Sequence, residues 1–315
     1  MMDAVSKVGL LVSRSTASSS YGVFYMAALI CVAFWAMLCL QTFWYFASYD
    51  TDKKLLKFLV VFLWVISTAQ TYVIVYGVWV FTIDHFGDYS FLVQVVPPFA
   101  TQFIFAATAT VTVQAFFVFR ICRLSGGGLW MVAVVWAALA IFQIVAAFII
   151  VVKTCLSGYL PYLWTPLPKD LAIAYLAVSL FIDIAIAIFL LKLLHRHKKE
   201  TQVRSTLKII QRLMVLAVLN MVWTTAFAIC DLVTFLSLQE EDFYLLFDMP
   251  ICSLYCNTLL ANLNMRASLG EQESVVDMDL TTFDAVGPPP VTLMLRNDTK
   301  VSTQSGSRVS LELAE

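Results

Sequence analysis

The sequence predicts an all-α protein: a polytopic integral membrane bundle of seven transmembrane helices, with the N-terminus outside and the C-terminus in the cytosol. Seven apolar intervals of 20 or more residues lack Lys, Arg and His. Hydrophobic residues make up 61% of the 315-residue chain and charged residues only 13%, which excludes an ordinary soluble surface. A membrane core takes about 20 apolar residues as a helix, because backbone groups in hydrocarbon must bond within the helix.

Charged residues separate the seven intervals and thereby set the predicted helix ends. In chain order, the predicted helices are 22–46, 58–82, 96–119, 129–152, 171–191, 213–238 and 243–264. The residues between them include Lys53, Lys54 and Lys57, then His85, then Arg120 and Arg123, then Lys153 and Lys169, then the basic run from Lys192 to Arg212, and finally Glu240 and Asp242.

The distribution of Lys and Arg sets the predicted orientation, because basic residues in short loops stay on the cytoplasmic side. The loops after the first, third and fifth helices and the start of the tail hold 13 of them, while the opposite side holds 4. Residues 1–20 therefore form a short outer segment, extracellular or lumenal, and residues 21–266 the transmembrane domain. Residues 267–315 are acidic and rich in Ser and Thr, which predicts a disordered cytosolic tail.

Three carboxyl groups lie within predicted spans, where every ionisable residue is a candidate functional group. Asp183 lies near the middle of the fifth helix, and Asp231 and Asp248 lie in the outer parts of the sixth and seventh. None of the seven spans contains a Lys or Arg that would neutralise them. The candidate intramembrane polar site, drawn from the last three helices, comprises Asp183, Asn220, Thr224, Asp231, Asp248 and Asn257.

Two interpretations of this polar interior remain open. Buried acids without a positive partner either stay neutral or wait for a cation or a proton-linked ligand. Alternatively, Asn, Ser, Thr and protonated Asp side chains hold helices together by hydrogen bonds. The seventh helix carries polar residues on two faces, one with Ser253 and Asn257 and the other with Asp248 and Asn262. This pattern predicts a central position for that helix.

The sequence offers no catalytic constellation, and we expect that the protein is not an enzyme. His85 lies on the predicted outer side and His195 and His197 on the inner side, so the histidines form no metal site, and no Cys-x-x-Cys spacing occurs. Residues 243–264 lack the Schiff-base Lys of a retinal-binding pump. We therefore expect no metal and no cofactor. No nucleic-acid partner is expected either, because no basic helix carries interleaved aromatic residues.

Four stretches of the sequence carry a resemblance to a known family. They are WYFASYDTDKKLLKFLVVFLW, FFVFRICRLS, RSTLKIIQRLMVLAVLNMVWTTAFAICDLVTF and LYCNTLLANLNMRASL. Together they resemble a fungal family, chiefly of mushroom-forming basidiomycetes, of seven-helix membrane proteins known only as a domain of unknown function. The resemblance covers about residues 21–270. It implies seven helices with the N-terminus outside, and it implies no activity.

The last stretch, where the seventh helix leaves the membrane, is the most specific. The positions that match the family's signature there are Asn257, Asn262, Asn264 and Arg266. We interpret Asn262 and Asn264 as caps of the last carbonyl groups of the helix, and Arg266 as a contact to lipid phosphate.

The sequence leaves three classes of function open. Seven helices, an outer N-terminus and a basic inner loop at 195–212 that a cytosolic partner could bind favour a receptor-like sensor. Asp183 and Asp231 would instead serve a proton-linked carrier of a small solute. A structural or lipid-organising role is the third class. The lipid bilayer is the one partner that the sequence implies directly; the ligand is unknown, and plasma membrane and endomembrane are not distinguished.

Overall fold

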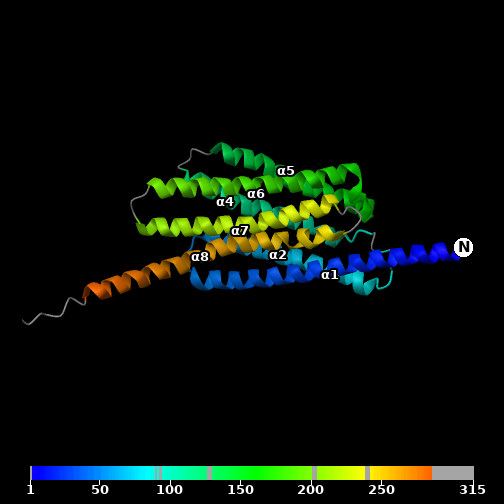
Figure 1. Ribbon diagram of the computed structural model, residues 1–315, viewed down its shortest axis with the longest axis horizontal. Coiled ribbons are helices and arrows are strands. Elements are labelled where there is room, and N and C mark those ends of the chain that lie inside the picture. Colours follow the sequence, from blue (N-terminus) through cyan, green and yellow to red (C-terminus); the bar gives the residue numbers. More distant parts are fainter. Residues whose placement is uncertain are drawn as a thin grey trace, which may run out of the picture. The chain divides into compact units, whose positions relative to one another are not determined.

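The computed structural model of the chain is all-helical (Figure 1). It describes residues 2–88, 91, 94–125, 130–200, 204–237 and 242–285. Side chains are described from 21 to 265, apart from the gaps between these ranges and from 161, 194, 197–214, 216–217 and 219–220. Contacts within the chain group residues Met1–Glu273 in one unit and Ser274–Glu315 in another.

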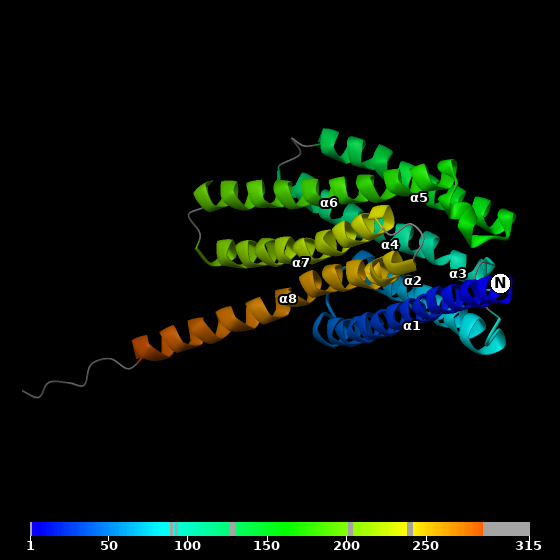
Figure 2. The same ribbon diagram turned by 45° about the vertical axis from the view of Figure 1, so that its right-hand side comes forward.

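Seven long helices and four short helical segments make up the described chain. In order they are α1 (Met2–Ser48), α2 (Lys54–Trp79) with a π-helical continuation η1 (Val80–Asp84), α3 (Pro97–Ala100), α4 (Gln102–Leu124), α5 (Trp130–Ser157), the 3₁₀ turn η3 (Leu160–Trp164), α6 (Pro166–Glu200), α7 (Arg204–Ser237), the 3₁₀ turn η4 (Asp242–Tyr244) and α8 (Leu245–Ala285). The long helices run side by side along a common direction (Figures 1 and 2).

Six helical segments among the described residues are long and apolar enough to cross a membrane. They are Tyr21–Ser48, Lys54–Asp84, Pro97–Leu124, Trp130–Ser157, Pro166–Leu193 and Asp242–Met265. Within α7, the stretch Met221–Ser237, whose side chains are described, is a shorter apolar helix. The all-α class and six of the seven predicted spans are thus confirmed by length and composition, and the predicted span at 213–238 is helical to Ser237.

Large apolar side chains cover the outside of these segments. Leu40, Phe43 and Tyr72 are 70%, 74% and 69% exposed. Trp223 on α7 is 65% exposed. A soluble protein rarely exposes apolar patches of this extent, whereas lipid tails accept them at little cost. The outer surface therefore supports a multi-pass membrane protein.

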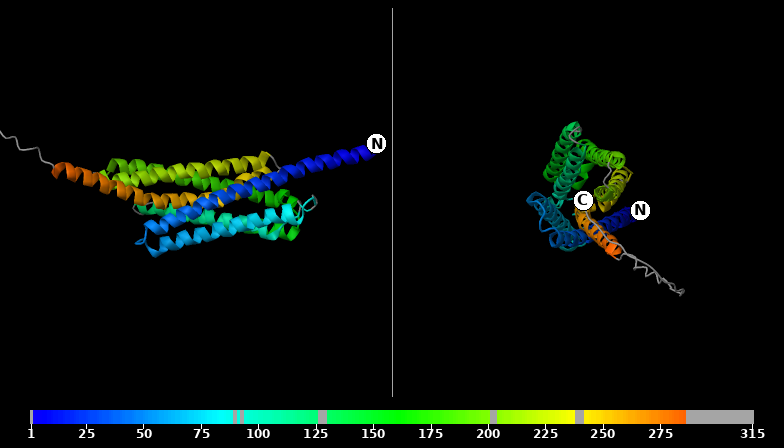
Figure 3. Two further views of the ribbon diagram at one scale, coloured as in Figure 1. Left: turned by 90° about the horizontal axis from the view of Figure 1, so that it is seen from below. Right: turned by 90° about the vertical axis from the view of Figure 1, so that its left-hand side faces the viewer.

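The seventh long helix, α8, lies at the centre of the bundle, as the sequence predicts. In its apolar window 83% of the residues are buried, against 28% to 50% in the other five spans. Its hydrogen bonds reach α2 through Gln70 Nε2, which donates to the Met249 carbonyl at 2.8 Å, and α1 through Asn257 Nδ2, which donates to the Phe34 carbonyl at 2.8 Å. The end-on view in Figure 3 shows α1 and α2 on the opposite side of the bundle from α5 and α6.

Several helices extend beyond their predicted ends. The predicted inner loop at 195–212 is mostly helical, because α6 continues to Glu200 and α7 already begins at Arg204. Likewise α8 continues to Ala285, into the predicted tail at 267–315, of which 286–315 lie outside the described residues. The predicted ends follow the thickness of hydrocarbon, but helical hydrogen bonds do not stop where the lipid does. The disorder predicted for the tail stays a prediction.

Candidate functional site

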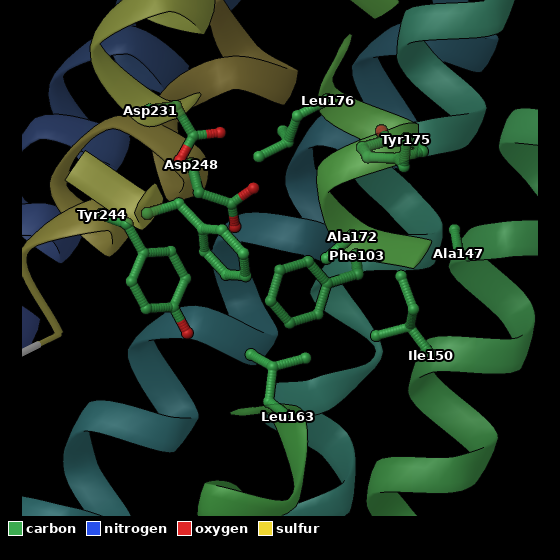
Figure 4. Close-up of a pocket in the computed structure, with 11 residues that line it drawn as sticks. Phe103, Ala147, Ile150, Leu163, Ala172, Tyr175, Leu176, Asp231, Tyr244 and Asp248 are labelled. Carbon is green, nitrogen blue, oxygen red and sulfur yellow. The ribbon is translucent and has the colours of Figure 1, made fainter. Parts of the chain in front are cut away.

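A cavity lies among α4, α5, α6, α7 and α8, near the bundle end that carries the turns η3 and η4 (Figure 4). The volume open to the centres of water molecules is about 40 Å³. Its walls are mainly apolar or aromatic, with Phe103 from α4, Ile150 from α5, Leu163 from η3 and Leu176 from α6. The cavity is therefore a small space within the bundle, formed by residues far apart in the sequence.

Two carboxyl groups face this cavity. Asp231 of α7 and Asp248 of α8 lie next to each other, with their side chains directed into the space (Figure 4). Asp231 is fully buried, and neither of its carboxyl oxygens has a hydrogen-bond partner among the described residues. Asp248 is 8% exposed. Buried polar groups in proteins are nearly always hydrogen-bonded, so an unpartnered carboxyl group in a cavity requires an explanation.

Aromatic side chains form much of the wall around the two acids. Tyr175 of α6 and Tyr244 of η4 line the cavity together with Phe103. Phe235 holds Tyr244 in place by an edge-to-face contact with a ring-centre distance of 5.3 Å, and Trp164 stacks on Phe235 at 4.9 Å. The faces of such rings carry negative potential, which adds to the negative character of the site.

A second, smaller cavity continues from the first toward the end of the bundle. The two share the lining residues Phe103, Ile150, Leu163 and Tyr244, and the second also reaches Gln94 in the segment before α3. That segment is fastened to the segment after α5, because the Val95 amide donates to the Gly158 carbonyl at 3.1 Å. The second cavity thus lies between the Asp231 cavity and the segments that precede α3 and follow α5.

Asp183, the third predicted acid, lies in a different environment. It is fully buried, but the Tyr255 hydroxyl of α8 donates to its Oδ2 and Gln114 Nε2 of α4 donates to its Oδ1 at 3.1 Å. Gln143 of α5 donates in turn to Gln114 Oε1 at 3.2 Å. Asp183 does not line the Asp231 cavity. This chain joins four helices, so Asp183 fits the interpretation of a hydrogen-bonded link between helices.

Among the remaining predicted site residues, Thr224 and Asn257 are buried and hydrogen-bonded. Thr224 Oγ1 donates to the Met221 carbonyl of its own helix at 3.0 Å. Asn257 Nδ2 donates both to the Phe34 carbonyl of α1 and to the Ser253 carbonyl of α8, each at 2.8 Å. Neither residue lines the Asp231 cavity. The side chain of Asn220, although its backbone lies in α7, is outside those described.

The interpretation of Asn262 and Asn264 as helix caps is wrong, because α8 does not end there but continues to Ala285. Instead, Arg120 Nη1 of α4 donates to Asn262 Oδ1 at 2.6 Å. Asn264 joins α8 to α1: its Nδ2 donates to the Gln41 carbonyl at 2.9 Å, and its own carbonyl accepts from the Tyr49 hydroxyl at 2.8 Å. The side chain of Arg266 lies outside the described residues.

Sequence reasoning missed several residues of the Asp231 cavity and of the hydrogen-bonded chain around Asp183. Gln114 and Gln143 lie within predicted spans, so the rule that selects membrane-embedded polar residues applies to them as well. Tyr175 and Tyr244 gave no such indication, because tyrosine is common at membrane interfaces and in apolar cores. No group of three or more His, Cys, Asp or Glu side chains that could hold a metal occurs among the residues whose placement the structure describes.

The bonds of Asn257 lead to a stability prediction. Replacing Asn257 by Leu leaves the Phe34 carbonyl without this donor inside the bundle, and an unsatisfied buried group costs about 1–3 kcal/mol. We expect a lower melting temperature in detergent and poor surface delivery. Arg266→Ala is the comparison, because we expect Arg266 to contact only lipid headgroups and therefore to contribute much less. If Arg266→Ala lowers the melting temperature more, this segment binds a specific lipid or a cytosolic partner.

The three buried acids lie in the part of the chain that matches a family model. Residues 179–268 match a family of unknown function, DUF6534. No curated protein and no solved structure matches the chain. The matched range contains Asp183, Asp231 and Asp248, whereas the first two of the four stretches that carry the family resemblance lie outside it. Over residues 179–268, therefore, the chain is similar to a family of unknown function.

Proposed function

We propose that this protein is a receptor-like seven-helix membrane protein of the fungal family that its sequence resembles, and that it binds a small molecule in the Asp231 cavity. The single observation that carries the proposal is the pair of unpartnered oxygens on Asp231, fully buried and facing a cavity. An interior group without a partner destabilises the fold by itself. A ligand that supplies the missing hydrogen bonds gives this group a role.

The predicted topology supports access from outside. With the N-terminus outside, the turns η3 and η4 belong to the outer end of the bundle. Asp231 lies six residues before Ser237, the last residue of α7, which corresponds to a depth of about 9 Å at 1.5 Å per residue. A small molecule from the outer side then reaches the cavity without crossing the membrane core.

One helix connects this cavity with the opposite end of the bundle. α8 carries Asp248 at the cavity and Asn262, fourteen residues later, at the contact with Arg120, a separation of about 21 Å along the helix. Because α8 is buried and bonded to α1, α2, α4 and α6, a shift of α8 disturbs several helices at once. We propose that binding moves α8 and alters the contact between Arg120 and Asn262.

Hydrogen–deuterium exchange tests this function. Purified protein in nanodiscs is first screened by thermal shift against small water-soluble amines, carboxylates, alcohols and sugars, and exchange is measured with each compound that stabilises it. We expect slower exchange around Asp231 and Asp248 and a change at the far end, around Arg120 and Asn262. A stabilising compound that leaves the far end unchanged contradicts the receptor-like role. No stabilising compound in any class contradicts the binding site itself.

The topology is tested separately. With 13 basic residues against 4 on the two sides, we expect a reporter fused after Glu315 to be cytosolic. Asn297, in the sequon Asn297-Asp298-Thr299, should then carry no glycan. Endoglycosidase-sensitive sugar on Asn297 in the native protein would show that the orientation is the opposite one. The Asp231 cavity would then lie at the cytosolic end.

A proton-linked carrier is the second candidate, favoured by the hydrogen-bonded chain from Gln143 through Gln114 to Asp183 and Tyr255. Asp183 is the carboxylic acid of this hydrogen-bonded chain, and buried acids mark proton pathways in transporters. Purified protein in liposomes with a pH-sensitive dye inside distinguishes the two functions. Proton movement that depends on a solute and that Asp183→Asn abolishes supports the carrier. If vesicles with the wild-type protein show no such proton movement, the carrier function is excluded.

A further inference from the structure

We propose that the ligand of the Asp231 cavity is a short-chain primary ammonium ion, such as methylammonium, held between the carboxyl groups of Asp231 and Asp248. The inference rests on the proposed function, because it names the class of molecule that this binding site accepts. Three properties of the site lead to it: its charge, its size and the chemistry of its walls.

The charge of the site suits a cation. Among the described residues, the lining contains two carboxyl groups and no Lys, Arg or His. Asp231 is fully buried, and no described donor lies within reach of either of its oxygens. Burial without a positive partner favours the neutral acids, and a cation between the two carboxyl groups stabilises their ionised forms. A neutral or anionic ligand gives no such stabilisation.

The size of the site restricts the cation to a few atoms. The cavity volume is about 40 Å³, whereas an engineered cavity that accepts benzene measures about 150 Å³. A small ion of a few non-hydrogen atoms therefore fits, and aromatic amines are too large. Quaternary ammonium ions are excluded as well, because they have no N–H group for the Asp231 oxygens.

The walls favour an organic ammonium ion over a metal ion. Sodium, magnesium and calcium prefer a shell of several oxygen ligands, whereas most of the lining here consists of apolar and aromatic side chains. A primary ammonium group has three N–H donors, which match carboxylate oxygens that have no other donor. The faces of Phe103, Tyr175 and Tyr244 suit both the charge and a short alkyl group.

The test is binding of methylammonium chloride to the purified full-length protein in nanodiscs at constant ionic strength, measured by calorimetry and thermal shift. Sodium chloride, tetramethylammonium chloride and methanol serve as comparison probes for charge, size and hydrogen bonding. Three variants accompany the wild type. Asp231→Asn removes the charge, Ala172→Leu fills the cavity without touching either acid, and Asp183→Asn is the matched control, a buried acid outside the cavity.

We expect saturable binding of methylammonium to the wild type and to Asp183→Asn, and binding weaker by about tenfold or more in Asp231→Asn and Ala172→Leu, because a buried charged hydrogen bond is lost or the space is filled. Sodium and methanol should not compete. Equal binding to all variants, or none to the wild type, overturns the inference. Methylammonium can fail to bind while a compound of another class stabilises the wild type but not Asp231→Asn. In that case the proposed function stands and only the inferred class of ligand is wrong. The sodium, methanol and wild-type results hold even if a variant does not fold.

Discussion

Asp183→Leu is expected to destabilise the bundle more than any other single replacement among the polar residues. Leu cannot accept a hydrogen bond, so the Tyr255 hydroxyl and the Gln114 amide both lose their acceptor in the interior. Each unsatisfied buried donor costs about 1–3 kcal/mol, which together is a large share of the stability of a typical domain. The measurement is the melting temperature in detergent, together with the fraction of monodisperse protein.

Asp183→Asn provides the matched control. Asn is similar in size, its carbonyl can accept from Gln114, and its amide can donate to the Tyr255 oxygen. We expect this variant to fold and to melt close to the wild type. Similar losses in Asp183→Leu and Asp183→Asn would mean that the charge of Asp183, rather than its hydrogen bonds, holds the four helices together.

Gly77→Ala is expected to have the second large effect, for a steric reason. A Cβ atom on Gly77 of α2 would lie 2.8 Å from Cγ and 2.9 Å from Cβ of Phe99 in α3. Phe99 cannot move away easily, because its ring packs edge-to-face against Phe24 at 5.7 Å and Phe81 at 5.9 Å. Overpacking of this kind typically costs about 1–3 kcal/mol. We expect a lower melting temperature.

Gly22→Ala is the control for this prediction. Gly22 also lies in a helix, α1, but a Cβ there would meet nothing within 4 Å. Alanine in a helix is favoured over glycine by about 0.5–1 kcal/mol, so this variant should melt at or slightly above the wild-type temperature. A Gly77→Ala variant that melts like Gly22→Ala would show that α2 and α3 do not approach each other closely.

The sequence predicted the elements of this fold well, because the membrane imposes a simple rule on length and polarity. The interval 58–82 lies within α2 and η1, and α5 covers the interval 129–152 from Trp130 onward. The central position of α8 followed from polar residues on two of its faces, and its burial confirms this prediction. Helix ends were predicted poorly. Nothing in the residues near 191 or 264 stops a helix, so α6 and α8 continue beyond the apolar intervals.

The candidate site was predicted only in part, for a different reason. Periodicity places Asp183 and Asp231 on inward faces, and both are indeed fully buried. It does not specify which groups on other helices they meet. Asp183 meets Tyr255 and Gln114, whereas Asp231 meets Asp248 and a cavity. The same residue type at similar helix positions thus enters two different environments, and only the packing of five helices decides which.

We infer that Asp183 stabilises the bundle whereas Asp231 serves a ligand, and the melting temperature of ligand-free Asp231→Leu distinguishes these two roles. A buried carboxyl group without a partner destabilises the protein by about 1–3 kcal/mol, so its replacement by an apolar side chain should leave the melting temperature unchanged or raise it, in contrast to Asp183→Leu. Functional sites are often less stable than they could be. If Asp231→Leu melts as far below the wild type as Asp183→Leu does, Asp231 is a structural hydrogen-bonding residue and the account of a binding site is wrong.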